Sequence, residues 1–523
     1  MTPRKYDEKD HDGVVVPDVQ QQEQEQERLN CDYLVVGAGT SGMSFTDTIL
    51  SEDPKATLIV VDRNERPGGH WVHAYPFCRI HQTNCNYGVN SMTLGKNISK
   101  KGIERYDVRD RSTAQEILEY YQRVREKFEA TGRVKFFFGA EYKEFDASRG
   151  VHKIVADENK SGETNIVEVR CRRKLVTVEN NVVVPSMREP TIPVHEAASF
   201  VSVNALPESL GSGTFRNYVV FGCGKTGADA IVHLLRDGGV DPSRITWIVS
   251  RDVWYFLREG LEDFYATNDT ISIPTLECGS VEDIYLGWEE RGLLGRLDRS
   301  TIPKVFKGPT MDNAELELMR SVEKIVRMGR ALSVEQHTIV LEKGSIDYDP
   351  DTTLLVDCMV DAFFGYDTPN NYSIFEPGHI KLGPTTFIFN PSFSAAHIAF
   401  VECALGENND DAKNDCLYHI PQDKPNVASK PETFIGVFYL QLKNTDKLMK
   451  IPGGRKFFLN SRTNLSAPKH HKGGMLRFLW YAFGPKQMMK KSKRIEKKID
   501  SKGYSDLDHC FGAETVGTVE IAF

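Results

Sequence analysis

Residues 34–42 read LVVGAGTSG, and this apolar run ending in glycines decides the fold of the chain. The apolar residues 33–36 predict a buried parallel strand, and residues 43–50 predict the helix that follows it. In such a turn the first glycine permits a tight bend, the second lets the backbone approach a pyrophosphate, and the third lets the helix pack on the strand. Because free amides at a helix N-terminus bind anions, we expect a dinucleotide site here. Its predicted contacts are Gly37, Gly39, Thr40, Ser41 and Gly42.

A second apolar run, residues 57–61, ends at Asp62, which follows Gly42 by 62 − 42 = 20 residues. This is the spacing of an acid that binds a ribose hydroxyl. We assign Asp62 and its neighbour Arg63 to the same site. The alternative is a chance glycine turn, but strand, glycines, helix, strand and acid follow one another in the order that a dinucleotide site requires.

The same pattern returns in residues 218–227, YVVFGCGKTG, 222 − 37 = 185 residues downstream. A helix is expected over residues 228–235 and a strand over residues 245–249. This second strand ends in Ser250 and Arg251 rather than in an acid, and an arginine pairs with a 2′-phosphate that a carboxylate would repel. The repeat therefore predicts a site for NADPH, unless Arg251 is only a solvated loop residue. Its predicted contacts are Gly222, Gly224, Lys225, Thr226, Gly227, Ser250 and Arg251.

Composition limits the class of protein. The 523 residues predict two or three domains, and a net charge of −8 argues against a nucleic-acid partner. Because no apolar run of about 18 residues and no signal peptide is found, we expect a soluble, cytoplasmic protein. The ten cysteines are scattered without a CxxC pair, so neither a metal site nor a disulfide framework is predicted.

Between and after the glycine motifs the pattern predicts further elements. Thr113 and Glu116 form a capping box for a helix that ends before Gly132. A helix is expected over residues 314–328, and another from Ala395 onwards. Short apolar runs separated by Gly, Asn and Ser predict a small antiparallel meander. Its strands are expected at residues 134–138, 142–145, 151–155 and 166–169.

The two ends of the chain differ from its middle. Residues 1–30 surround a Gln/Glu run with almost nothing to bury, and predict a disordered leader. Aromatic runs at residues 434–440 and 476–483 precede residues 486–498, which hold seven basic side chains and one acid. This basic segment predicts a patch for a peripheral membrane or an acidic partner, with a solvated helix face as the alternative.

Taken together, these blocks resemble the flavoproteins that contain two dinucleotide-binding domains. Residues 68–71, GGHW, resemble the GGxW stretch of flavin-containing and Baeyer–Villiger monooxygenases. Residues 356–358 and 393–402 resemble a less characterised branch of FAD/NAD(P)-binding oxidoreductases, and the resemblance spans residues 31–405. It implies that FAD occupies the first glycine site, that NADPH occupies the second, and that hydride passes from NADPH to the flavin.

The predicted fold class is α/β, with two Rossmann-like dinucleotide-binding domains for FAD and NADPH, a small antiparallel β meander and a helical C-terminal extension. The expected FAD-binding domain consists of residues 31–210 and 346–420. The expected NADPH-binding domain, with an insertion, consists of residues 211–345, and the aromatic and basic extension of residues 421–523. The N-terminus of the helix from Ala395 would face the flavin ring.

The loop after the first βαβ unit is where related enzymes bring the chain past the flavin. We therefore add Gly69, His70, Trp71 and Gln82 to the predicted cofactor contacts, with His73, Arg79 and His81 as further candidates for the pocket wall. No catalytic dyad is recognisable and no catalytic residue is assigned. The bound cofactors would supply the chemistry.

Three functions stay open at this level. A monooxygenase acting on a small organic substrate is favoured by the resemblance, although the FxGxxxH linker motif of that class is absent from residues 194–201. A flavin reductase or dehydrogenase without oxygen insertion and a non-catalytic nucleotide-binding protein are the alternatives. A flavin disulfide reductase is disfavoured, because 85 − 78 − 1 = 6 residues separate Cys78 from Cys85, more than the redox pair of that class allows.

Overall fold

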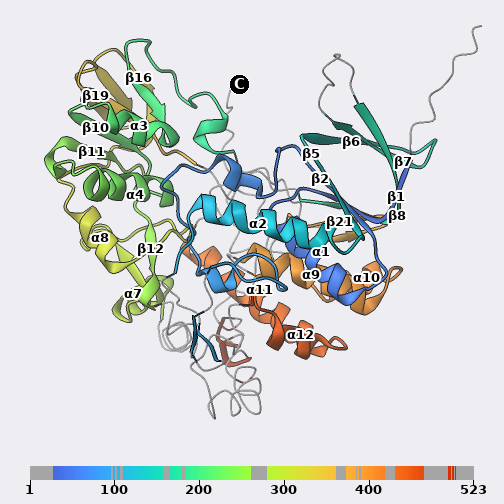
Figure 1. The fold of residues 1–523 in the computed structure, drawn as a ribbon. Helices are drawn as coiled ribbons and strands as arrows, with labels where there is room; N and C mark the ends of the chain where they lie inside the picture. The colour runs from blue at the N-terminus through green and yellow to red at the C-terminus, as the bar shows by residue number, and fades with distance from the viewer. Residues whose placement is uncertain are drawn as a thin grey trace, which may run out of the picture.

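A computed structural model gives the architecture of the chain (Figure 1). It describes residues 28–501 with internal gaps. The gaps are residues 96–97, 101–102, 106–109, 157–164, 179–182, 261–278, 361–372, 384–385, 388–389, 419–429, 465–489, 491–492, 496 and 500. The predicted leader therefore lies outside the described residues except for its last three, of which Leu29 and Asn30 already belong to the first strand. The aromatic run at residues 476–483 also lies outside them.

The first sheet is built around the strand that precedes the first glycine turn. Its strands run in the order β20-β21-β8-β1-β2-β5, with β6 and β7 continuing from β8 as an antiparallel extension. Strands β21, β8, β1, β2 and β5 are mutually parallel. The bounds are β1 (Leu29–Val36), β2 (Leu58–Asp62), β5 (Val134–Phe138), β6 (Ala140–Asp146), β7 (Val151–Ala156), β8 (Asn165–Thr177), β20 (Phe375–Glu376) and β21 (His379–Lys381).

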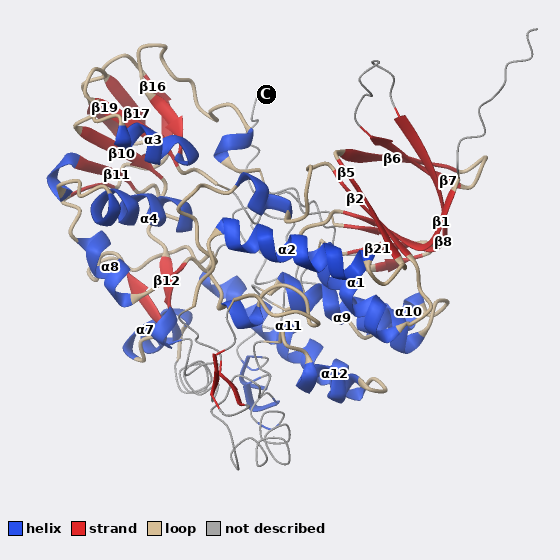
Figure 2. Ribbon diagram, viewed as in Figure 1, coloured by secondary structure: helices blue, strands red, loops and turns tan. Residues whose placement is uncertain are grey.

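The two faces of this sheet are covered differently. Side chains alternate along a strand, so Tyr33 and Val35 face helices while Leu34 faces the meander. Figure 2 shows the helices gathered beside one face, with β6 and β7 on the outer side. The helices are α1 (Thr40–Glu52), α2 (Ala114–Glu129), α9 (Pro391–Leu405) and α10 (Asp410–Asp415).

Several predictions for this unit are confirmed and others are wrong in detail. The capping box of α2 is present, with Glu116 N donating to Thr113 Oγ1 at 3.3 Å. The run at residues 134–138 is not part of the meander, because β5 pairs in parallel with β2. Pairing with a long-range neighbour is invisible to local periodicity. Helix α9 begins at Pro391 rather than Ala395, because Asn390 caps it by accepting a hydrogen bond from Phe393 N at 3.0 Å.

The second sheet repeats the first in a shorter form. Its order is β15-β11-β10-β19-β9, and every pair is parallel. A three-stranded antiparallel meander packs on one face, as it does in the first unit. The strands are β9 (Phe200–Ser202), β10 (Asn217–Phe221), β11 (Ile245–Ile248), β15 (Lys324–Val326), β16 (Ala331–Val334), β17 (Thr338–Leu341), β18 (Gly344–Asp347) and β19 (Thr353–Asp357), and the helices are α3 (Leu206–Gly211), α4 (Lys225–Val232) and α8 (Asn313–Arg320).

Two expectations for this unit differ from the structure. The helix predicted over residues 314–328 ends at Arg320, since residues 324–326 form β15 against β11. Strands β9 and β19 lie in the second sheet, although the predicted domain boundaries assign both to the first unit. The predicted domain boundaries at residues 210 and 345 therefore do not coincide with the division of the strands between the two sheets. The boundaries of the domains themselves stay a prediction.

A smaller third layer joins the insertion to the C-terminal extension. Strands β12 (Trp254–Leu257), β13 (Leu294–Arg296) and β14 (Thr310–Met311) form one sheet beside α7 (Val281–Glu290). Phe434, on α11 (Pro431–Lys450), is buried against this layer, and the Tyr285 hydroxyl donates to the carbonyl oxygen of Pro431 at 3.1 Å. The described part of the aromatic run at residues 434–440 therefore packs inside the protein.

The remaining elements are short. The hairpin of β3 (Ile98–Lys100) and β4 (Ile103–Arg105) and helix α12 (Gly454–Asn460) lie outside the two nucleotide units. Within the described ranges, no helix combines the length and the apolar character needed to cross a membrane.

Candidate functional site

The first glycine turn leaves no room for side chains. A Cβ atom on Gly42 would lie 1.9 Å from the carbonyl oxygen of Gly37, and Gly37 has a φ of 113°. Only glycine adopts such a backbone without strain. Both positions therefore need glycine for steric reasons, as the sequence predicts.

The N-terminus of α1 is open for an anion. Gly39 is the N-cap residue, and none of the described side chains caps this end of the helix. The first intrahelical bond joins Met43 N to the carbonyl oxygen of Gly39 at 3.0 Å. The amides of residues 40–42 therefore have no acceptor within the helix, which makes this end suitable for a phosphate group.

Asp62 lies beside this turn rather than in solvent. Its Oδ2 accepts a hydrogen bond from Ala38 N at 2.6 Å, and its Oδ1 accepts from the backbone and side chain of Asn64 at 2.8 and 2.9 Å. A carboxylate offers about four acceptor positions, so one stays available for a ribose hydroxyl. The carboxylate is thereby fixed in place next to the glycine turn. Arg63, its neighbour, is exposed.

The GGHW segment lies directly against the glycine turn. Gly68 N donates to the carbonyl oxygen of Ala38 at 3.0 Å. A Cβ atom on Gly69 would lie 2.9 Å from the Cα atom of Gly39, and Gly69 has a φ of 59°. The two predicted glycine segments, far apart in sequence, are thus brought to backbone contact.

Thr40 and Trp71 are held by a buried network of hydroxyl groups. The Trp71 Nε1–H donates to the Tyr87 hydroxyl at 2.6 Å, and the Tyr121 hydroxyl donates to Thr40 Oγ1 at 2.8 Å. Tyr87 and Thr40 are themselves hydrogen-bonded to each other. The polar atoms of these two predicted site residues therefore bond within the protein. Ser41 is half-buried, and no side-chain bond of its own joins it to this network.

Gln82 and Asn86 each bury an oxygen that has no hydrogen-bond partner among the described residues. Buried polar atoms in native proteins are normally paired, so such atoms mark a place for a missing ligand group or water. Both lie on the segment that follows the GGHW loop. The Gln82 oxygen therefore needs a partner that the described residues do not supply, and its role as a cofactor contact stays a prediction.

Two histidines of this segment are held neutral. Burial, together with the charges of Lys225 and Arg258, lowers the pKa of His81 well below its ordinary value. Desolvation by surrounding protein lowers the pKa of His70 to about 4. The His70 side chain is nevertheless exposed, and solvent screening limits the shift there. At neutral pH both rings are uncharged, which suits a contact to an apolar ring better than a contact to a phosphate.

The second glycine turn reproduces the first. Gly222 has a φ of 110°, and a Cβ atom on Gly227 would lie 2.0 Å from the carbonyl oxygen of Gly222. Gly224 is the N-cap residue of α4, and no described side chain caps this helix. Thr226 and Lys225 lie in its first turn, and both are half-buried. This end of α4 is equally suited to a phosphate group.

The edge of the second site carries two arginines in different states. Arg251 is exposed, and no hydrogen bond or ion pair joins its guanidinium to a described residue. Arg327, in contrast, donates twice to Asp252, at 2.9 and 3.1 Å. Ser250 is half-buried beside Arg251. Arg251 therefore remains available for a 2′-phosphate. Asp252, the acid that follows Arg251 in the sequence, is paired with Arg327 instead.

Charged side chains that the sequence did not single out gather between the two units. Glu315 accepts hydrogen bonds from Arg258 at 2.9 Å and from Arg111 at 3.2 Å. Desolvation alone would raise the pKa of Glu315, but the charges of these two arginines lower it to about 2. Arg258 Nε is buried without a partner in the described part of the chain. No spacing rule predicts this cluster, because its three members come from three separate segments.

Cys78 does not have the character of a redox thiol. Its side chain is buried, and desolvation raises its pKa to about 12. A catalytic thiol needs a lowered pKa. The exclusion of a flavin disulfide reductase, which rests on the cysteine spacing, stays a prediction.

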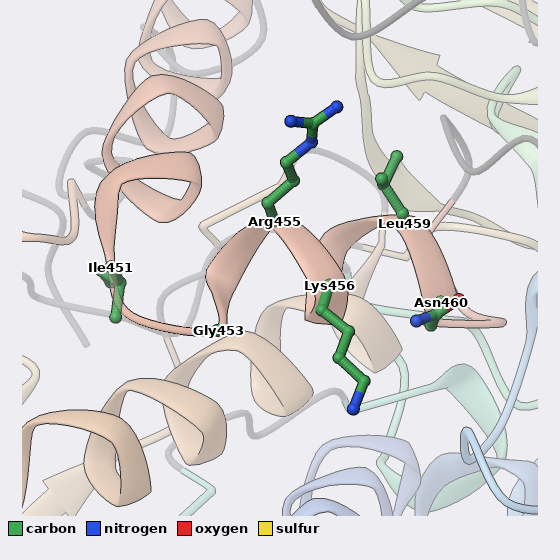
Figure 3. Close-up of a pocket in the computed structure, with 6 residues that line it drawn as sticks. All are labelled: Ile451, Gly453, Arg455, Lys456, Leu459 and Asn460. Atoms are coloured by element: carbon green, nitrogen blue, oxygen red, sulfur yellow. The ribbon is translucent and has the colours of Figure 1, made fainter. Parts of the chain in front are cut away.

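A surface pocket of about 480 Å³ lies elsewhere, at the junction of α11 and α12. Arg455 and Lys456 on its wall point in opposite directions in Figure 3. They do not converge on a ligand, and none of the glycine segments lines this pocket. The chemistry is therefore expected at the glycine turns and not here.

Curated relatives place the chain in a family. The uncharacterized protein Rv2000 of Mycobacterium tuberculosis is 34% identical over 460 residues, which are 85% of this chain and 80% of the relative. Mb2023 of Mycobacterium bovis matches to the same extent. The chain belongs to the family of these mycobacterial proteins. No model of an established protein family matches it.

Solved structures support the predicted fold class. The polycyclic ketone monooxygenase from the fungus Thermothelomyces thermophila matches with a TM-score of 0.51 over 93% of this chain and 90% of that chain, at 11% identity. A complex of OTEMO with FAD and NADP matches with a TM-score of 0.48 and 15% identity, over 72% of this chain and 85% of that chain. The first likeness confirms the predicted α/β fold, which the chain shares with that ketone monooxygenase.

Proposed function

We propose that the chain is a FAD-dependent oxidoreductase that takes hydride from NADPH. The observation that carries this proposal is the duplication of the site. In each unit a parallel strand leads into a glycine turn in which a Cβ atom on the last glycine would clash with a backbone oxygen, and each turn leads into a helix with an uncapped N-terminus. One such turn is a common structural device, whereas two in one chain indicate two nucleotides.

The residues at the first turn fit FAD. The amides of α1 would bind its pyrophosphate, and Asp62 would accept a ribose hydroxyl. The unpartnered oxygens of Gln82 and Asn86 offer acceptors on the segment that leads away from the GGHW loop. The backbone contact between Gly39 and Gly69 brings the GGHW segment next to the expected pyrophosphate position, where it would add to the contacts with the cofactor.

The residues at the second turn fit NADPH. The amides of α4 would bind the pyrophosphate, and the unpaired guanidinium of Arg251 would bind the 2′-phosphate. The exposure of Arg251 suits a nucleotide that enters and leaves in each cycle. NADPH is an intracellular metabolite, so the proposal includes a location inside the cell.

When both cofactors are bound, they supply hydride transfer from the nicotinamide to the flavin. The chain itself binds and orients the two nucleotides, and it excludes water with the aromatic network of Trp71, Tyr87 and Tyr121. The neutral rings of His70 and His81 would line the space next to the flavin without adding charge.

The finer proposal is a monooxygenase acting on a small organic substrate. It rests on the GGHW segment, on the fold shared with a ketone monooxygenase, and on the FAD and NADP named for the related OTEMO complex. A reductase that transfers electrons to an organic acceptor would use the same two turns. A non-catalytic nucleotide-binding protein would use them without turnover.

One experiment separates these functions. The purified protein is mixed with NADPH in air in the presence of small ketones, and NADPH, oxygen, hydrogen peroxide and products are measured together. We expect oxygen consumption that matches the oxygenated product. Release of hydrogen peroxide alone, with no product, would favour a reductase, and no consumption of NADPH would contradict the enzyme hypothesis.

A further inference from the structure

The loop that follows the GGHW segment contacts α4, the helix after the second glycine turn. The Tyr75 hydroxyl donates to Asp229 Oδ2 at 2.6 Å. Phe77 stacks on His233, with ring centroids 4.1 Å apart and planes at 2°. Asp229 lies on α4 and His233 is the C-cap residue that directly follows it, so the four-residue spacing places the two side chains one turn apart on the same face. Tyr75 and Phe77 of the first unit thus contact two successive helical turns of the second unit.

The contact continues to the glycine motif. Asp229 accepts from Tyr75 through one oxygen and from the Lys225 ammonium through the other. Lys225 is the first residue of α4, next to the uncapped amides. Tyr75, Asp229 and Lys225 therefore form one chain of hydrogen bonds, which we name the Tyr75 relay. It leads from the flavin-side loop to the expected pyrophosphate position.

The relay is sheltered from solvent. The side chains of Lys225 and Asp229 are 8% and 14% exposed, and Tyr75 is buried. Burial and the charge of Asp229 raise the pKa of Tyr75 well above its ordinary value, so its phenol remains a donor at neutral pH. An ion pair in such a place has a defined geometry, because water cannot easily substitute for either partner.

We propose that Tyr75 is a positioning residue for hydride transfer: through Asp229 and Lys225 it sets the orientation of the second unit's phosphate-binding helix relative to the flavin loop. This inference rests on the proposed function and deepens it. A nucleotide held by α4 can deliver hydride only if its nicotinamide reaches the flavin within van der Waals distance. Small misplacement of this kind reduces rate far more than binding.

The test replaces Tyr75 by phenylalanine, which removes one hydroxyl and keeps the ring. The matched control is Tyr285→Phe, which removes another buried hydroxyl with a single acceptor, in the third layer. In anaerobic mixing at saturating NADPH we expect flavin reduction to slow about tenfold in Tyr75→Phe. The Kd for NADP⁺ should stay within about twofold, and the control should match the parent protein.

A second readout does not depend on activity. Hydrogen exchange of the α4 amides, measured on the full chain without added nucleotide, should be several-fold faster in Tyr75→Phe than in Tyr285→Phe. In an Asp229→Ala background the Tyr75→Phe change should add nothing to either readout, because the relay is already broken.

Unchanged reduction rate and unchanged exchange in Tyr75→Phe would overturn the proposal, as would equal effects of Tyr75→Phe and Tyr285→Phe or full additivity with Asp229→Ala. Failure of the proposed function has a different signature. A protein that retains no flavin or is not reduced by NADPH would contradict that function, while the exchange comparison would still decide whether Tyr75 holds α4.

Discussion

The two nucleotide units share a framework and differ at their edges. Each has a set of parallel strands, a glycine turn, a helix with an uncapped N-terminus and an antiparallel meander on one face. In each turn two glycines lie so close together that a side chain on the second would clash with the carbonyl oxygen of the first. In the first unit Asp62 and Thr40 are hydrogen-bonded within the protein around the turn. In the second, Arg251 is exposed and unpaired within the described structure. The framework is thus common to both, and we propose that the edge residues distinguish a resident nucleotide from an exchanging one.

The largest effect is expected when a side chain is introduced into one glycine turn at a time. Gly42→Ala places a methyl group 1.9 Å from a carbonyl oxygen, and Gly227→Ala places one at 2.0 Å. We expect each change to weaken its own nucleotide about a thousandfold, or about 4 kcal/mol. Flavin content and NADP⁺ titration measure the two losses separately.

Gly42→Ala should therefore lose FAD, and Gly227→Ala should keep FAD and lose NADPH. The control is Gly211→Ala, where nothing lies within 4 Å of the added Cβ atom. If both turn variants lost the same nucleotide, the assignment of two separate sites would be wrong.

Acid should weaken the second unit through Glu315. Its folded pKa of about 2 lies below the ordinary value of 4.5, so its contribution is complete above pH 4.5 and is lost as pH falls towards 2. The expected loss between pH 5 and pH 3 is about 2 kcal/mol in the free energy of unfolding. Urea titrations should show a flatter pH dependence over this interval in Glu315→Gln.

The control for this prediction is Glu317→Gln on the same helix, whose side chain is 64% exposed. The first unit should respond in the opposite sense at Asp47, because burial raises the pKa of that carboxyl and protonation relieves the cost. A pH dependence in Glu315→Gln that equals that of the parent protein would contradict the role assigned to the arginine pair.

Nucleotide preference tests the contrast between Asp62 and Arg251 directly. Arg251→Ala should weaken NADPH about tenfold, or about 1.4 kcal/mol, because one charge-assisted contact to the 2′-phosphate is lost. NADH should be affected less than twofold. Equal weakening of both nucleotides would show that Arg251 is only a solvated loop residue.

The smallest expected effect compares the two threonines at the helix N-termini. Thr40→Val removes a hydroxyl that bonds to Tyr87 and Tyr121, and should lower the free energy of unfolding by about 1 kcal/mol. Thr226 is half-buried as the second residue of α4, where α1 has Ser41, and no hydrogen bond joins its hydroxyl to a described residue. Thr226→Val should therefore change the free energy of unfolding by less than about 0.5 kcal/mol. Thermal unfolding measures both, and a larger loss in Thr226→Val would contradict the contrast.

Sequence patterns predicted the parts of the molecule that depend on local chemistry. The glycine turns, β1, β2, β10, β11 and the capping box of α2 follow from residues that are close together in the chain. Tertiary pairing decided the rest. β5 and β15 each join a parallel sheet through a distant partner, which is why one was assigned to the meander and the other to a helix.

The candidate site shows the same division. Both glycine turns could be located from spacing, but the Tyr75 relay and the Glu315 cluster could not, since their members come from separate segments and carry no motif. The sequence predicts Thr40 and Trp71 as cofactor contacts, but it does not reveal the partners of their polar atoms. Only the fold shows that these atoms bond to Tyr121 and Tyr87.

The central claim is that hydride passes from a nucleotide at the second turn to a flavin at the first. Anaerobic mixing of the purified protein with NADPH tests it most directly, through the visible absorbance of the flavin. We expect the flavin to be bleached by NADPH, more slowly by NADH, and not at all in Gly227→Ala. A flavin that keeps its colour with NADPH, or a Gly227→Ala protein that is bleached as fast as the parent, would contradict the claim.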